Sequence, residues 1–153
     1  MQIQCIILRV KYFTIEDEDM QRKIARENTF ILIFEKICKQ DETCEDIFRK
    51  ATEIRGLEYD DYVRTVFFGT AENEKIIDEM VERHSVGWKK GRISPVSLSV
   101  IRLAAYEMMF MSDIPARVSI NEAIELSKKY DDEKAYSFVN GVLNGIADEL
   151  SEK

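Results

Sequence analysis

The sequence is poor in the residues on which enzymes and metal sites usually depend. Its 153 residues contain one histidine, His84, and three cysteines, Cys5, Cys38 and Cys44. The cysteines are odd in number and form no C-x-x-C pair, so we expect neither a disulfide framework nor a zinc site, and a reducing cytoplasm is the simplest location. No G-x-S-x-G motif, phosphate-binding glycine loop or His–carboxylate pair occurs, which predicts a protein that is not an enzyme and has no cofactor.

Long hydrophobic runs and an excess of positive charge are also missing. The most apolar stretch, residues 95–111, is shorter than the roughly 20 residues that a membrane span needs, and Arg102 and Glu107 interrupt it. No secretory signal is recognisable, so we expect a cytoplasmic protein without a membrane partner. The 22 basic and 29 acidic residues give a net charge of −7, which argues against indiscriminate nucleic-acid binding. A local basic site remains compatible with this total, because salt screens charges beyond about 8 to 10 Å.

Residues 94–112 predict a central buried helix. Twelve of the seventeen residues from Pro95 to Met111 are apolar and lie on nearly all sides of the helix, so other helices must cover it. Ser94 can cap the first turn, and Pro95 suits the first helical position, where no backbone N–H is needed. Arg102 and Glu107 therefore need buried partners, because an unpaired buried charge is costly.

Helical periodicity predicts further helices on both sides of this one, and the fold class is all-α with about seven helices. The predicted helices run from Met20 to about Lys39, from Asp41 or Thr43 to near Gly56, from Glu58 to about His84 with a weak point at Gly69, from a capping box of Ser119 and Glu122 to Tyr130, and from Ala135 to Leu150. Gly141 and Gly145, four residues apart in the last helix, predict a close helix crossing. His84 continues an apolar stripe and is expected to be a packed residue rather than a ligand.

Residues 1–19 differ from the rest of the chain. They combine apolar, β-branched residues with an acidic run from Glu16 to Asp19, and no later segment reads as a partner strand. An isolated strand is not stable in water, so we expect this extra N-terminal segment to be disordered or loosely docked. The alternative is that the natural product begins at Met20.

Three basic residues, Arg22, Lys23 and Arg26, lie in the opening turns of the first predicted helix. Arg22 and Arg26 are four residues apart and share a face. Cations at this end oppose the helix dipole, at a cost of about 0.3 to 1 kcal/mol each when exposed. This placement suggests an external anion as ligand. The alternative is a solvated helix face in which Lys23 pairs with Glu27.

A second group of cations lies in the segment 85–93, S-V-G-W-K-K-G-R-I, in which two glycines bracket Trp88, Lys89 and Lys90 and Arg92 follows. An aromatic ring beside three cations can stack on a base and contact phosphates, so these four residues are secondary candidates for an RNA or partner contact. The alternative, which we favour, is a hinge whose tryptophan packs down as an anchor.

Taken together, the motifs resemble a known family. From about Met20 to Leu150 the chain contains, in this order, R-K-I-A-R-E, F-F-G-T, W-K-K-G-R-I, V-I-R-L-A-A-Y-E, D-I-P-A-R-V-S-I-N-E-A-I-E-L-S-K and F-V-N-G-V-L-N-G-I. This combination resembles the NusB family of bacterial transcription antitermination factors. The resemblance implies two small packed helical bundles, at about 20–85 and 93–150.

The resemblance also implies a function. Members of the family bind boxA RNA together with NusE, a small-subunit ribosomal protein, and join the RNA polymerase antitermination complex that prevents premature termination of ribosomal RNA transcription. Carried over to this sequence, the RNA-contacting residues are Arg22, Lys23 and Arg26. Gln21 and Ile24 stand where members can carry further basic residues, which suggests a weaker RNA site. The acidic run from Glu16 to Asp19 can compete with RNA for Arg22 and Arg26, so we expect deletion of residues 1–19 to strengthen RNA binding.

Two other readings stay open at this point. One is a protein scaffold or a self-associating homodimer of NusB-like domains with weak, non-specific RNA binding. The other is a NusB-like domain of the kind attached to RNA methyltransferases, although this chain has no catalytic domain that could methylate RNA.

Overall fold

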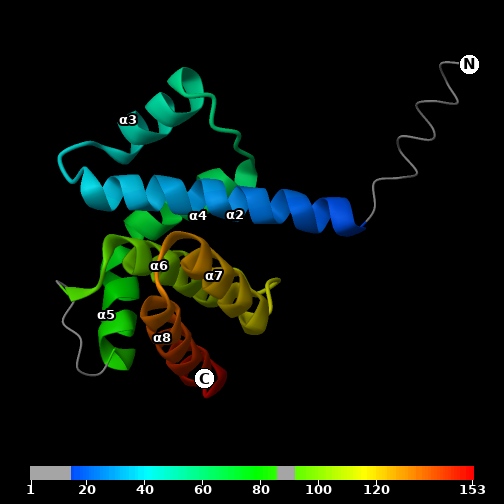
Figure 1. The fold of residues 1–153 in the computed structure, drawn as a ribbon, viewed down its shortest axis with the longest axis vertical. Coiled ribbons are helices and arrows are strands. Elements are labelled where there is room, and N and C mark those ends of the chain that lie inside the picture. Colours follow the sequence, from blue (N-terminus) through cyan, green and yellow to red (C-terminus); the bar gives the residue numbers. More distant parts are fainter. Residues whose placement is uncertain (1–14, 86–91) are drawn as a thin grey trace, which may run out of the picture.

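The fold is built entirely from helices in a computed structural model that describes residues 15–85 and 92–153, with side chains from residue 21 onward (Figure 1). The elements are α2 (Ile15–Cys38), α3 (Cys44–Arg49), the π-helical turn η1 (Lys50–Ile54), α4 (Asp61–Glu72), α5 (Glu74–His84), α6 (Pro95–Phe110), α7 (Ala116–Tyr130) and α8 (Glu133–Ser151). These two ranges contain no strand. The predicted all-α class with about seven helices is confirmed.

Helix α6 lies at the centre of the fold, as predicted. Helices α2, α4, α5, α7 and α8 all pack against it, and Figure 1 shows it between α2 and α4 on one side and α8 on the other. Its side chains from Ser97 to Glu107 are all buried. The Ser94 hydroxyl accepts a hydrogen bond from the Ser97 N–H at 3.1 Å, and Pro95 is the first helical residue. The sequence therefore specified both the start and the burial of this helix.

The first helix differs from the prediction in its start, whereas the second agrees with the prediction at both ends. Helix α2 begins at Ile15 rather than Met20, so the acidic run 16–19 lies within it. Acidic residue types are favourable at a helix N-terminus, which explains the earlier start. Thr43 caps α3 by accepting from the Asp46 N–H at 3.1 Å. The chain leaves η1 through Gly56, whose φ of +70° favours glycine, as the predicted end of this helix requires.

The predicted long helix from Glu58 to His84 is wrong. The chain forms two helices, α4 and α5, which meet at Asn73 and not at Gly69. The Asn73 side chain donates to the Gly69 carbonyl at 2.8 Å and so competes with the helical pattern at the end of α4. Gly69 lies inside α4, where a Cβ atom would overlap the Tyr106 ring. Its role is to let α4 approach α6 closely.

The predicted capping box at Ser119 and Glu122 is also wrong. Helix α7 begins one turn earlier, at Ala116 after Pro115, so both residues lie inside it. Ser119 is buried and its hydroxyl donates to Glu107 at 2.6 Å. The hydroxyl is thus used by a neighbouring helix rather than by the α7 backbone, a choice that the local sequence does not reveal.

The predicted helix crossing at α8 is confirmed at one of the two glycines. A Cβ atom on Gly145 would lie 2.7 Å from His84 Nδ1, so α5 crosses α8 there, whereas Gly141 has open space around it. His84 is packed, as predicted, and its Nε2 lies 2.5 Å from Glu149 Oε2.

The division into two bundles stays a prediction, and residues 1–14 lie outside the described ranges. No helix in those ranges has the length and apolarity that a membrane crossing requires.

Candidate nucleic-acid interface

Because α2 begins at Ile15, Arg22, Lys23 and Arg26 lie about two turns or more inside it, and the predicted conflict with the helix dipole is wrong. The three residues occupy different environments. Lys23 is exposed, Arg22 is half-buried, and Arg26 is only 4% exposed. Successive residues of a helix turn by about 100°, so neighbours in the sequence face different surroundings. The basic cluster is therefore two outward cations and one internal arginine.

Arg26 belongs to a buried polar network centred on Glu107 of α6. The Arg26 Nε donates to Glu107 Oε1 at 2.8 Å, the Tyr62 hydroxyl donates to the same oxygen, and the Ser119 hydroxyl donates to Oε2. Glu107 has no exposed surface, and its three donors come from α2, α4 and α7. A buried carboxylate needs such partners, since desolvation is otherwise too costly. One side chain thus joins four helices.

The electrostatics of this network favour a charged Arg26. Burial alone would lower the pKa of Arg26, but the charge and hydrogen bond of Glu107 outweigh it, so the pKa is raised. Burial and Glu107 together raise the pKa of Tyr62, which keeps its hydroxyl protonated as a donor. Arg26 and Glu107 therefore form a buried ion pair, and little of the Arg26 side chain reaches the surface.

Arg22 lies one turn before Arg26 and rests on the ring of Tyr62. Its guanidinium carbon is 4.5 Å from the ring centroid, a cation–π contact. No carboxylate pairs with Arg22 among the residues whose side chains are described. Because stacking on a ring leaves the planar N–H donors available, Arg22 can form a bidentate contact with a phosphate.

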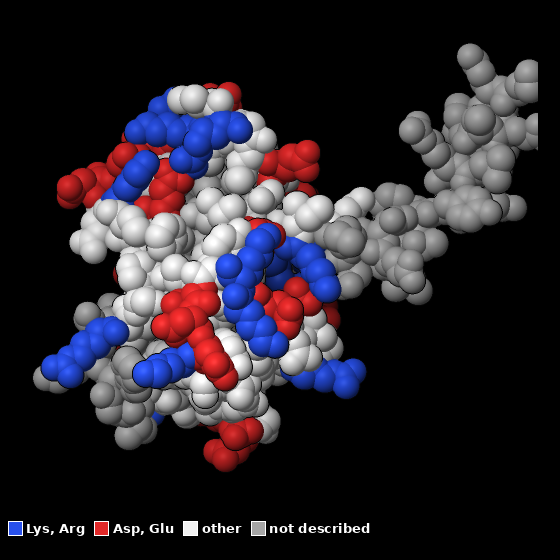
Figure 2. Space-filling model, viewed as in Figure 1, with Lys and Arg blue, Asp and Glu red and all other residues white. Residues whose placement is uncertain are grey.

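Lys23 lies at a groove between α2 and α7. The groove has a volume of about 290 Å³ and is lined by Lys23, Arg26, Glu27, Glu122, Glu125, Leu126 and Lys129. Lys23 Nζ is 3.9 Å from Glu122, and Lys129 Nζ is 2.5 Å from Glu27. Figure 2 shows basic side chains gathered around this part of the surface with acidic side chains between them. The surface is therefore mixed in charge.

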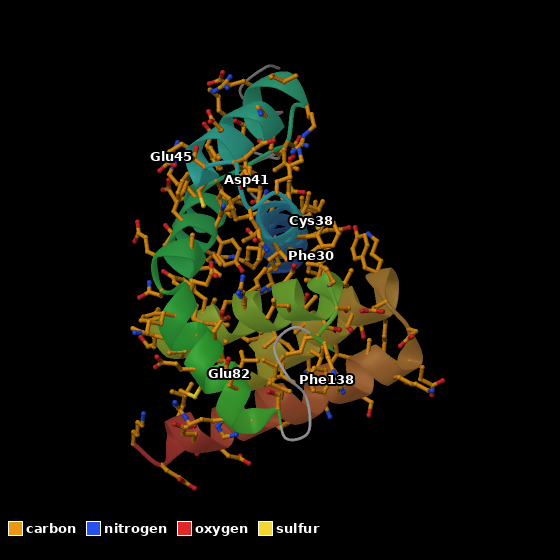
Figure 3. All side chains as sticks on the ribbon, turned by 90° about the vertical axis from the view of Figure 1, so that its left-hand side faces the viewer. Phe30, Cys38, Asp41, Glu45, Glu82 and Phe138 are labelled. Atoms are coloured by element: carbon orange, nitrogen blue, oxygen red, sulfur yellow. The ribbon has the colours of Figure 1, made fainter. Side chains whose placement is uncertain are left out.

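An aromatic side chain completes this surface. Tyr130, at the end of α7, is 40% exposed, and its hydroxyl donates to Glu27. Its ring lies 4.9 Å from the ring of Phe30, which is on the side of α2 that faces the core (Figure 3). Hydrogen bonds from Lys129 and Tyr130 lower the pKa of Glu27, so this carboxylate is charged. An exposed ring beside cations is an arrangement that can stack on an unpaired base.

Comparison with known proteins identifies the family of this chain. The NusB family model matches residues 23–148, most of the chain. The chain belongs to the NusB family. The transcription antitermination protein NusB of Natranaerobius thermophilus is 41% identical over 137 residues, covering 87% of this chain and 99% of that protein. That of Bacillus licheniformis is 42% identical over 131 residues, covering 86% and 99%.

Solved structures of NusB proteins share the fold. T. maritima NusB is similar with a TM-score of 0.74 and 35% identity, covering 86% of this chain and 97% of that chain. A crystal structure of the antitermination factors NusB and NusE in complex with dsRNA matches with a TM-score of 0.74 and 27% identity, covering 84% and 96%. The relatives are thus matched over nearly their whole length.

The remaining predicted site residues of this NusB-family chain are placed as follows. Arg92 is exposed just before α6, and Trp88, Lys89 and Lys90 lie outside the described residues. No cluster of metal-binding side chains occurs among the residues that the structure describes. The roles of Trp88, Lys89 and Lys90 therefore stay predictions, and Arg92 does not line the groove between α2 and α7.

Sequence reasoning missed Tyr62, Lys129 and Tyr130 as parts of the site. Tyr62 reads as one more apolar residue of a helical stripe, and nothing local marks its contact with Arg22. Lys129 and Tyr130 carried a signal, because K-K-Y sets cations beside a ring in the last turn of α7. Only the fold shows that this turn lies beside Glu27 and Phe30 of α2.

Proposed function

We propose that this protein is a transcription antitermination factor that binds boxA RNA together with NusE and so prevents premature termination of ribosomal RNA transcription. The observation that carries the proposal is the similarity to transcription antitermination proteins over 87% of this chain and 99% of the relative. The solved NusB and NusE complex with dsRNA supports both partners. The role is non-enzymatic, is exercised in the cytoplasm, and includes entry into the RNA polymerase antitermination complex.

Within this function, Arg22, Lys23 and Lys129 are the proposed phosphate contacts. Arg22 has no carboxylate partner among the described side chains, and both lysines line or border the groove between α2 and α7. Arg26 instead anchors α2 to α6 through its buried ion pair with Glu107. Three contacts to single-stranded RNA correspond to a slope of about −2 in a plot of log affinity against log salt. Such modest binding is consistent with a factor that acts jointly with NusE.

Fluorescence anisotropy with a boxA-containing RNA tests this function. The full chain is titrated against boxA RNA and a scrambled RNA of equal length, with and without NusE. We expect NusE to tighten binding at least tenfold for boxA RNA and the scrambled RNA to bind poorly. Binding that ignores both sequence and NusE would refute the proposal and favour the protein scaffold or homodimer instead.

A further inference from the structure

We propose that Tyr62 and Glu107 are positioning residues for RNA binding, because they hold the Arg22 guanidinium at the surface in a geometry ready for a phosphate. The inference rests on the proposed function and deepens it. Neither residue needs to touch RNA: Glu107 is fully buried, and Tyr62 is buried with its ring beneath Arg22.

Tyr62 is anchored at both ends of its side chain. Its backbone belongs to the first turn of α4, where Asp60 caps the helix by accepting from the Val63 N–H at 2.9 Å. Its hydroxyl is bonded to Glu107 Oε1. These two anchors restrict the ring to the orientation in which its face meets Arg22.

Further hydrogen bonds hold the Glu107 carboxylate in place against Tyr62. Its Oε1 also accepts from Arg26, and its Oε2 accepts from Ser119 at 2.6 Å. Arg26 is four residues after Arg22 on α2, so the same carboxylate fixes both the helix that carries Arg22 and the ring on which Arg22 rests. The distance between ring and guanidinium is thereby set by one buried centre.

The stacked position of Arg22 lowers the entropic cost of binding a phosphate. A free arginine side chain loses rotamer freedom when it binds a phosphate, and a stacked one has already lost most of it. Among the side chains that the structure describes, the neighbour of Arg22 is a ring rather than a carboxylate, and this leaves its N–H donors available to a phosphate. Lys23, which reaches Glu122 only at 3.9 Å, has no such support and serves as the matched comparison.

A double-mutant cycle on RNA binding tests the inference. The affinity of the full chain for boxA RNA with NusE is measured for Arg22→Ala, Tyr62→Leu and the double variant, and for Lys23→Ala with and without Tyr62→Leu. We expect Tyr62→Leu to weaken binding about three- to tenfold in the wild-type and Lys23→Ala backgrounds, and less than twofold in the Arg22→Ala background. A general effect on the fold would instead weaken binding equally in all three.

Tyr62→Phe keeps the test decisive if Tyr62→Leu does not fold. It retains the ring and loses only the hydroxyl bond to Glu107. We expect it to weaken binding by about twofold when Arg22 is present and not at all when Arg22 is absent. An equal effect in both backgrounds, or no effect in either, overturns the positioning role. If Arg22→Ala itself leaves RNA binding unchanged, the proposed RNA site fails as well, so the two failures are distinguishable.

Discussion

Arg26 of α2 donates from Nε to Glu107 Oε1 of α6 at 2.8 Å, and both side chains are buried. This ion pair explains the basic residue at this position, and because α2 begins at Ile15, Arg26 lies in the middle of the helix, away from the end where the dipole disfavours cations. Its partner is inside the protein, 81 positions later in the chain. The cluster of Arg22, Lys23 and Arg26 thus combines a structural residue with two outward ones.

Breaking this pair should destabilise the protein strongly. We expect Arg26→Ala to lower the free energy of unfolding by about 3 to 5 kcal/mol, because it leaves the Glu107 carboxylate buried without its counter-charge. Urea denaturation followed by circular dichroism measures the change. Lys23→Ala is the control and should alter stability by less than about 0.5 kcal/mol, since its side chain is exposed. Equal stability of the two variants would contradict the assignment of Arg26 as internal.

Two glycine-to-alanine substitutions should change the free energy of unfolding in opposite directions. Gly69→Ala places a methyl group against the Tyr106 ring, so we expect a loss of about 1 to 3 kcal/mol in the free energy of unfolding. Gly141→Ala adds a methyl group in open space on α8 and should stabilise the protein by up to about 1 kcal/mol. Thermal unfolding of the two variants side by side measures both effects. A stabilising Gly69→Ala would show that α4 and α6 do not cross closely at this residue.

The ion pairs of Glu149 should make the stability of the protein depend on pH in the acidic range. Hydrogen bonds from Arg83 and then His84 lower the pKa of Glu149 from 4.5 to about 2. A carboxylate with a lowered pKa in the folded state stabilises the fold above its unfolded pKa, and this contribution is lost as the pH falls toward 2. The difference in urea midpoint between wild type and Glu149→Gln should therefore be largest near pH 6 and should close toward pH 2. A difference that stays constant over this range would count against the ion pairs.

Removing a carboxylate from the α2–α7 groove should strengthen RNA binding. Glu122 is the ion-pair partner of Lys23 and would compete with a phosphate for it. We expect Glu122→Gln to raise the affinity for boxA RNA about twofold, in keeping with the small energy of an exposed ion pair. Glu79→Gln removes the same charge from the exposed surface of α5 and should leave affinity unchanged, because salt screens distant charges. Equal effects of the two would indicate that only net charge matters.

The sequence predicted those parts of the fold that depend on local signals. Ser94 and Pro95 mark the start of α6, and Thr43 marks the start of α3, because capping requires particular residue types at particular positions. The break at Asn73 was missed, since the apolar pattern continues from α4 into α5. The false capping box at Ser119 has a similar cause, because a serine hydroxyl serves a helix end and a buried carboxylate equally well.

The site was predictable only in part. The outward position of Arg22 and Lys23 agrees with the sequence reasoning, whereas burial separates Arg26 from them. Contacts such as Arg22 with Tyr62 join residues that lie far apart in the chain, and no local pattern records them. The positioning network was therefore visible only once four helices were assembled around Glu107.

The salt dependence of RNA binding tests the central claim most directly. The affinity of wild type and of the double variant Arg22→Ala/Lys23→Ala for boxA RNA is measured with NusE over a range of salt concentrations. Each phosphate contact to single-stranded RNA contributes a slope of about 0.7, so the variant should lose about 1.4 from the slope and bind more weakly at every salt concentration. An unchanged slope and affinity would contradict the claim that Arg22 and Lys23 of α2 contact the RNA backbone.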